Sequence, residues 1–246
     1  MAALCIFCHG RANSKEHLWP KWLVDSVVLD RSSTIEMMFA TRPDVIIDDG
    51  KYVTCRCVCK KCNEGWMSKL ETGTKPILEP LIYDSSSPLD YVKQLALSIW
   101  TTKTAMVYEC VKGQAAFYTP ADRQHLLAWR TPPPDTLIWI GRYENSFTLF
   151  VENHYLSNPR NANVLSEGCV TTFAMGRLVI QVFTARRSPH GKGRSINVAK
   201  KEGEWDRLLI QIWPALEEVV RWPPPLSFGP SEEKLQELAK RIGSQR

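Results

Sequence analysis

The chain has 246 residues, 44% of them hydrophobic and 23% charged, with a formal net charge of +5. This composition is typical of a globular protein with a buried core, and it excludes an intrinsically disordered chain. There is no apolar run of about 18 residues, so we expect no membrane span. The N-terminal stretch MAALCIFCHG lacks the basic and apolar regions of a secretory signal, so we expect a cytoplasmic protein.

The first 80 residues contain the signals of a small mixed domain. A short helix is predicted from about Pro20 to Val28, with the proline in its first turn. The stretches STIEMMFAT and KYVTCRCV have strand-like content and are separated by the turn-rich RPDVIIDDG. The stretch NEGWMSKLETG predicts a helix that ends at Gly73. The proline- and serine-rich segment 74–88 then predicts a boundary, which gives one domain over 1–80 and a second over 81–246.

The second domain opens with a long predicted helix over about 88–110, followed by a strand at AAFY and a helix at TPADRQHLLAWR that Thr119 caps. Four strands are then predicted, at DTLIWIGRY, SFTLFVEN, CVTTFAM and RLVIQVFTA, and a hairpin at Met175-Gly176 joins the last two. Later helices are predicted at 203–213 and 231–242, with WPPPLSFGP between them as a polyproline-II-like connector. Strands flanked by helices indicate an α+β domain with a mainly antiparallel sheet.

Six of the eight cysteines lie in the first quarter of the chain. Cys5 and Cys8 form one Cys-x-x-Cys pair and Cys59 and Cys62 another, and four thiolates are the complete ligand set of a structural zinc site. Cys55 and Cys57 alternate along a predicted strand with Cys59, so one of them is an alternative ligand. Cys110 and Cys169 lie in apolar segments, where buried core thiols are expected.

A zinc ion that joins the two pairs would bring three distant polar residues together. Glu16 and His17 follow the first pair in SKEHLWP, and Asn63 follows the second pair directly. A carboxylate and an amide oxygen are hard ligands of the kind that suit Mg²⁺, and a neutral histidine beside such an ion can take a proton from water. Simpler roles remain open, because His17 could be a surface residue and Asn63 a helix cap.

The pattern C-x2-C, EH-x-x-P, C-x2-CN resembles the HNH nuclease superfamily with its ββα-metal finger. It is most similar to the type with paired Cys-x-x-Cys knuckles found in the phage endonuclease VII resolvases. The resemblance covers about residues 5–71. It implies an N-terminal zinc-stabilised ββα-metal domain with a helical insert, a catalytic Mg²⁺ or Mn²⁺ ion on Glu16 and Asn63, and His17 as the general base.

The resemblance also implies a function, which is hydrolysis of DNA phosphodiester bonds in a bacterial or phage setting. The segment ARRSPHGKGR over 185–194 is basic and glycine-containing, as suits phosphate contact, and an ordinary solvated hairpin or crossover loop is the alternative. The candidate nucleic-acid contacts in it are Arg186, Arg187, Lys192 and Arg194. The alternative function is a catalytically weak or inactive zinc-finger adaptor that binds nucleic acid or a protein partner. Residues 81–246 are the candidate region for a protein partner or a second copy of the chain.

Overall fold

The computed structural model describes residues 3–27, 45–48, 51–113, 117–145, 149–157, 165–187, 207–240 and 242. Contacts divide the chain into two compact units, one comprising Met1–Pro76 with Ile99–Pro132 and the other Ile77–Ser98 with Pro133–Arg246. The units interleave along the sequence, whereas the sequence pattern suggested one boundary near residue 80. The architecture is α+β with a mainly antiparallel sheet, as predicted. No helix among the described residues is both long and apolar enough to cross a membrane.

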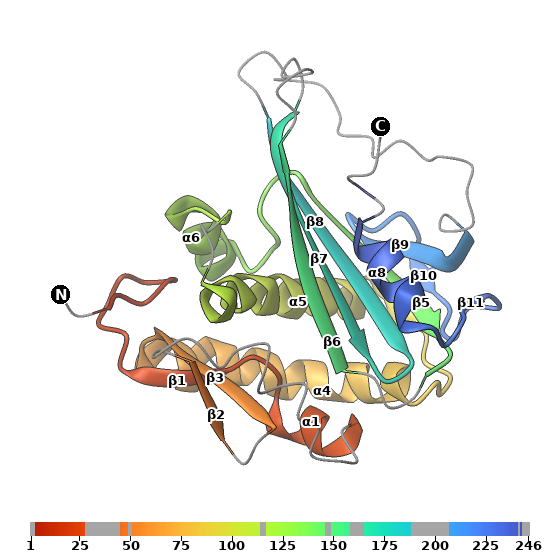
Figure 1. The fold of residues 1–246 in the computed structure, drawn as a ribbon, viewed down its shortest axis with the longest axis horizontal. Coiled ribbons are helices and arrows are strands. Elements are labelled where there is room, and N and C mark those ends of the chain that lie inside the picture. The colour runs from red at the N-terminus through yellow and green to blue at the C-terminus, as the bar shows by residue number, and fades with distance from the viewer. Residues whose placement is uncertain are drawn as a thin grey trace. The chain divides into compact units, whose positions relative to one another are not determined.

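The first unit contains a small antiparallel sheet, drawn in orange to red in Figure 1. Its strands are β1 (Ser14–His17), β2 (Val45–Asp48) and β3 (Tyr52–Val58), and β3 lies in the middle. Helix α1 (Lys21–Val27) follows β1 at the predicted place. The predicted turn at RPDVIIDDG is wrong in part, because its β-branched residues 45–47 form β2 instead. The strand predicted at 33–41 lies outside the described residues.

A broken helix follows β3. It consists of α3 (Lys60–Cys62), a wide turn η1 (Asn63–Met67) and α4 (Ser68–Ile82), with Gly65 in a non-helical conformation between them. The prediction that this helix ends at Gly73 is wrong, since α4 continues through Pro76 and Pro80. Leu78, Leu81 and Ile82 are buried along one face of this last part. Burial of that apolar stripe outweighs the hydrogen bonds that the two prolines remove.

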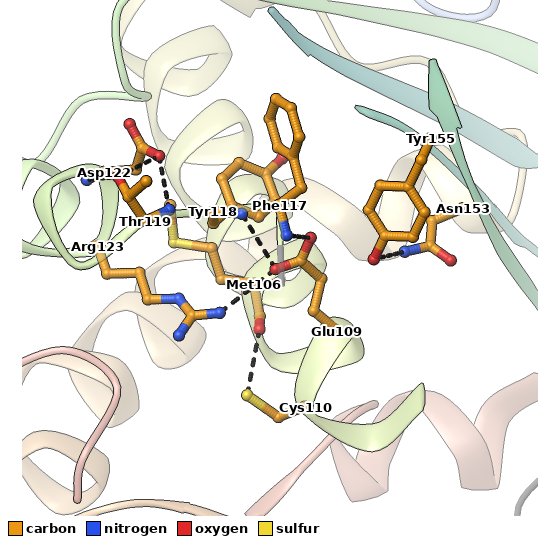
Figure 2. Close-up of polar contacts among 10 residues, drawn as sticks. All are labelled: Met106, Glu109, Cys110, Phe117, Tyr118, Thr119, Asp122, Arg123, Asn153 and Tyr155. Carbon is orange, nitrogen blue, oxygen red and sulfur yellow. Dashed lines mark hydrogen bonds and ion pairs between the residues drawn. The ribbon is translucent and has the colours of Figure 1, made fainter. Parts of the chain in front are cut away.

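Helix α5 (Tyr91–Lys112) is followed by α6 (Pro120–Trp129), both close to their predicted positions. Thr119 caps α6 as predicted, in a reciprocal arrangement with Asp122. Figure 2 shows how Glu109 of α5 holds the segment between the helices. Its carboxylate accepts the backbone N–H groups of Phe117 and Tyr118 at 3.0 and 3.3 Å and lies 3.3 Å from Arg123 Nη2. Phe117 and Tyr118 are therefore fixed in a bend and not in the predicted strand.

The second unit is built on a six-stranded sheet in the order β11-β5-β8-β7-β6, with β9 paired to β5. All neighbouring pairs are antiparallel except β11 and β5. The strands are β5 (Thr136–Tyr143), β6 (Leu149–Ser157), β7 (Leu165–Met175), β8 (Leu178–Arg187), β9 (Leu209–Trp213) and β11 (Ser227–Phe228). The predicted hairpin is present, and Gly176 adopts a φ of 54° in its turn.

Two predictions in this unit are wrong. Residues 209–213 form strand β9 where a helix was expected, and the segment WPPPLSFGP contributes β11 to the sheet edge. Helix α8 (Glu232–Lys240) forms as expected, and its Leu235 and Leu238 pack on Ala174 and Val179 of the sheet. A short pair of strands, β4 (Leu89–Asp90) and β10 (Val219–Val220), lies apart from the large sheet.

Candidate metal centre and active site

The four predicted zinc ligands gather at one place in the first unit. The sulfur atoms of Cys5, Cys8, Cys59 and Cys62 all lie within 4.8 Å of one another, and three of these residues are buried. Sulfur atoms around a tetrahedral zinc ion lie about 3.8 Å apart, given a Zn–S bond of about 2.3 Å. The cluster therefore fits a zinc ion, and among the described residues it is the one group of this kind.

Backbone hydrogen bonds shape both Cys-x-x-Cys turns. The N–H of Cys5 bonds to Gly10 O at 2.6 Å and that of His9 to Cys5 O at 3.0 Å, which closes the first turn. The N–H of Ile6 bonds to Cys57 O at 3.0 Å and so ties this turn to β3. In the second turn, Cys59 Sγ accepts the Cys62 N–H at 3.4 Å and caps the helix. The two-residue spacers thus aim both pairs of sulfurs at one point.

The electrostatics of the cluster favour a thiolate at Cys59. Burial alone would raise the pKa of Cys59, but hydrogen bonds from the Cys62 N–H and from the Cys8 thiol outweigh it and lower the pKa to about 7. Cys62 differs, because burial raises its pKa and the neighbouring Cys8 adds to that effect. A bound cation would deprotonate such a thiol directly.

Cys55 and Cys57 are not part of this cluster. They are two residues apart on β3, so their side chains share one face of the sheet. The Cys57 thiol is hydrogen-bonded to the thiols of Cys110 and Cys55, and these contacts raise the pKa of Cys57. Cys110 belongs to α5, so this face of the sheet packs against that helix. Cys59 and Cys62 are accordingly the pair that accompanies Cys5 and Cys8.

Glu16 and His17 lie on opposite faces of the small sheet. Glu16 is paired with Cys55 and His17 with Thr54 across the β1–β3 ladder, and successive side chains in a strand alternate between faces. Glu16 therefore faces α5, whereas the His17 ring lies beside Tyr52, with ring centroids 6.4 Å apart and planes nearly perpendicular. Although Glu16 and His17 are adjacent in sequence, their side chains therefore have different surroundings.

Glu16 has a buried ion-pair partner that the sequence pattern did not predict. Its Oε1 lies 3.0 Å from Lys103 Nζ on α5, and the two side chains are 7% and 2% exposed. Glu71 of α4 is close enough to respond to the same charges: burial raises the pKa of Glu71, and Lys103 opposes that rise. Lys103 is thus a cation that balances the buried Glu16 carboxylate and also acts on the half-buried Glu71.

Asn63 lies against β1, at the point just before Glu16. Its Nδ2 donates to Ser14 Oγ at 2.9 Å and to Lys15 O at 2.8 Å. Because a backbone carbonyl can only accept a hydrogen bond, the second contact fixes which end of the amide is nitrogen. The second knuckle therefore does bring Asn63 to the strand that carries Glu16 and His17.

The predicted basic segment is only partly described. Arg186 lies at the end of β8, and its Nε is 3.7 Å from Glu167 Oε2 on β7. Arg187 ends the same strand, and its side chain is not described. Lys192 and Arg194 lie outside the described residues.

The sequence contained a signal for the residue that was missed. Lys103 stands within SIWTTKTAMVY, where neighbouring positions are apolar or small. A lone lysine at the centre of an apolar helix needs a buried anionic partner, because an uncompensated buried charge is very costly.

Comparison with protein-family models, curated proteins and solved structures found no match to this chain.

Proposed function

We propose that the chain is a metal-dependent endonuclease of the HNH type that hydrolyses DNA phosphodiester bonds. One observation carries the proposal. The order of elements is knuckle, β1, α1, β2, β3, knuckle and helix, and a cluster of four cysteine sulfurs joins the turn before the strand of His17 to the turn before the helix that contains Asn63. This order supports a ββα finger closed by a zinc ion.

His17 is the group that would act on water. Its ring is half-buried on the face of the sheet away from α5. As the neutral imidazole it takes a proton from the attacking water while the new P–O bond forms and the bond to the 3′ oxygen breaks. The leaving oxygen takes up a proton from solvent.

Glu16 and Asn63 are the residues that would hold the Mg²⁺ or Mn²⁺ ion. Their oxygen atoms are hard donors of the right type, and the ion would neutralise charge on the scissile phosphate. Glu16 is already paired with Lys103. Metal binding at Glu16 therefore requires the carboxylate to share or exchange this ammonium partner, and the ion would have to reach the phosphate from the face of the sheet opposite His17.

Cleavage of a supercoiled plasmid in the presence of Mg²⁺ or Mn²⁺ tests the proposal. Wild type should nick or cut the plasmid, and His17→Ala should reduce the rate by about 10²–10⁴-fold, the usual cost of removing a general base. His125→Ala is the matched control, since this histidine is on α6 in the same unit and bonds to Thr131. Equal cleavage by wild type and His17→Ala would refute the assignment.

The second candidate is a zinc-structured binding module without catalysis. The specific observation that favours it is the buried Glu16–Lys103 pair, which neutralises the carboxylate on the face opposite His17. This function requires a protein that contains zinc and binds DNA or a protein partner but leaves the plasmid intact under every divalent ion tested.

A further inference from the structure

The ring of Tyr52 gathers two lysines beside His17. Tyr52 precedes Thr54 by two positions on β3, and Thr54 is the cross-strand partner of His17, so Tyr52 and His17 occupy one face of the sheet. Lys21 Nζ lies 5.0 Å and Lys51 Nζ 4.8 Å from the centroid of the Tyr52 ring. Lys21 begins α1 and Lys51 precedes β3, so separate segments bring these ammonium groups to one ring.

Among the described side chains, the carboxylate of Asp25 is bonded to this group. Asp25 Oδ1 accepts hydrogen bonds from Lys51 Nζ and from the Tyr52 hydroxyl, each at 2.5 Å. These two bonds hold the pKa of the Asp25 carboxyl below its usual range. Asp25 is therefore ionised at neutral pH, and its charge acts on both lysines. Among the side chains described on this surface next to His17, Lys21 and Lys51 carry two positive charges against one negative charge on Asp25, and the side chain of Asp48, the cross-strand partner of Tyr52, is not described.

The two lysines give this surface a preference for an anion. Two ammonium groups within about 5 Å of one ring centroid repel each other, and an anion bound near them weakens that repulsion. Lys21 and Asp25 are both exposed, so the approach is open to a ligand in solution. The Tyr52 ring attracts both lysine ammonium groups through cation–π contact and thereby favours one place for the anion.

We propose that Lys21 and Lys51, held by Tyr52, form a phosphate-binding subsite that positions the DNA backbone next to His17. The inference rests on the proposed function for the identity of its ligand. It differs from the basic segment 185–194, because it lies in the first unit on the face that carries the candidate general base. Asp25 weakens the subsite by its charge and limits its affinity for phosphate.

Binding of a short fluorescent DNA duplex, measured by anisotropy at several salt concentrations without added divalent ion, tests the subsite separately from cleavage. Lys21→Gln should lower affinity about fivefold at low salt, the effect of about 1 kcal/mol of Coulomb energy. It should also reduce the log–log salt slope by about 0.9. Asp25→Asn should instead raise the affinity for the duplex, because it removes the negative charge and keeps an acceptor for the Tyr52 hydroxyl.

The opposite signs distinguish this role from a structural one, since general destabilisation would weaken binding in both variants. Lys234→Gln is the matched control, because this exposed lysine is on α8 in the second unit. If wild type binds DNA, Lys21→Gln weakens and Asp25→Asn strengthens that binding, and no DNA is ever cut, the subsite stands and the nuclease proposal falls. If the protein cuts DNA while both variants bind like wild type, or if wild type binds no DNA, the subsite is refuted. Tighter binding of an RNA duplex would refute DNA as its ligand.

Discussion

The ammonium group of Lys103 lies 3.0 Å from a carboxylate oxygen of Glu16, and this contact joins α5 to the strand that carries His17. The two residues are 87 positions apart in sequence. Their nearly complete burial makes the pair sensitive to the loss of either charge. Glu16 is therefore a structural residue of the first unit, whether or not it also binds a divalent ion.

Lys103→Met should destabilise the protein by about 3–5 kcal/mol, because it leaves the Glu16 carboxylate buried without its counter-ion. Adding Glu16→Gln to the same chain should recover most of this loss, since the remaining side chains are uncharged. Unfolding by urea for the single and double variants measures both effects. Replacement of the exposed Lys234, which pairs with Glu237, should cost at most about 1 kcal/mol. An effect that small for Lys103→Met would contradict the prediction.

The local part of the candidate site could be predicted from sequence, and the tertiary part could not. The spacing of the two Cys-x-x-Cys pairs predicts both turns, because a two-residue spacer is a short-range constraint. The position of Asn63 against β1 follows from the pairing of these two turns. The partner of Glu16 does not, because only packing of α5 on the sheet determines that Lys103 faces it. The alternation of Glu16 and His17 between faces also depends on the β1–β3 pairing.

The same distinction between local sequence and tertiary packing separates the fold predictions that were confirmed from those that were wrong. The hairpin at Gly176 and the cap at Thr119 were predicted because their residues act locally. The segment at 208–213 has Leu208, Leu209 and Ile212 at helical spacing, yet residues 209–213 pair with β5 as strand β9. Here the available edge of β5 outweighs the local pattern, which is the usual limit of propensity arguments.

Loss of Cys62 should remove the zinc ion and unfold the first unit. Purified wild type should contain one zinc per chain, and Cys62→Ser should contain less than wild type and lose helical circular dichroism, since the metal contributes folding free energy directly. Cys110→Ala is the control, because this thiol bonds to Met106 O on α5 and is outside the four-sulfur cluster. Elemental analysis measures the metal content. Unoxidised wild type without zinc would show that the cysteines have another role.

The basic segment should affect affinity and leave chemistry unchanged. Replacing Arg186, Arg187, Lys192 and Arg194 together with Gln should weaken binding to any DNA duplex and flatten its salt dependence by about 0.9 in log–log slope for each lost phosphate contact. The cleavage rate at saturating DNA should stay close to that of wild type. Anisotropy titrations at several salt concentrations measure the slope. An unchanged slope would show that the segment does not contact phosphate.

Glu109→Gln should destabilise the first unit by about 1–3 kcal/mol, because the amide cannot accept from Tyr118 and Arg123 as the carboxylate does. Burial raises the pKa of Glu109 above its ordinary value of 4.5, although the N–H groups of Phe117 and Tyr118 oppose the rise. The native state therefore takes up a proton at a higher pH than the unfolded state. Stability from this group increases as the pH falls through the folded pKa toward 4.5.

The difference in unfolding free energy between wild type and Glu109→Gln should consequently widen as the pH falls from neutral to about 5. Urea unfolding of both proteins across that range measures the difference. Glu237→Gln on the exposed face of α8 is the control, and it should change stability by at most about 0.5 kcal/mol. A difference that narrows toward acid would mean that Glu109 is held in its charged form by Arg123 and the two N–H groups, and that burial is the weaker influence on it.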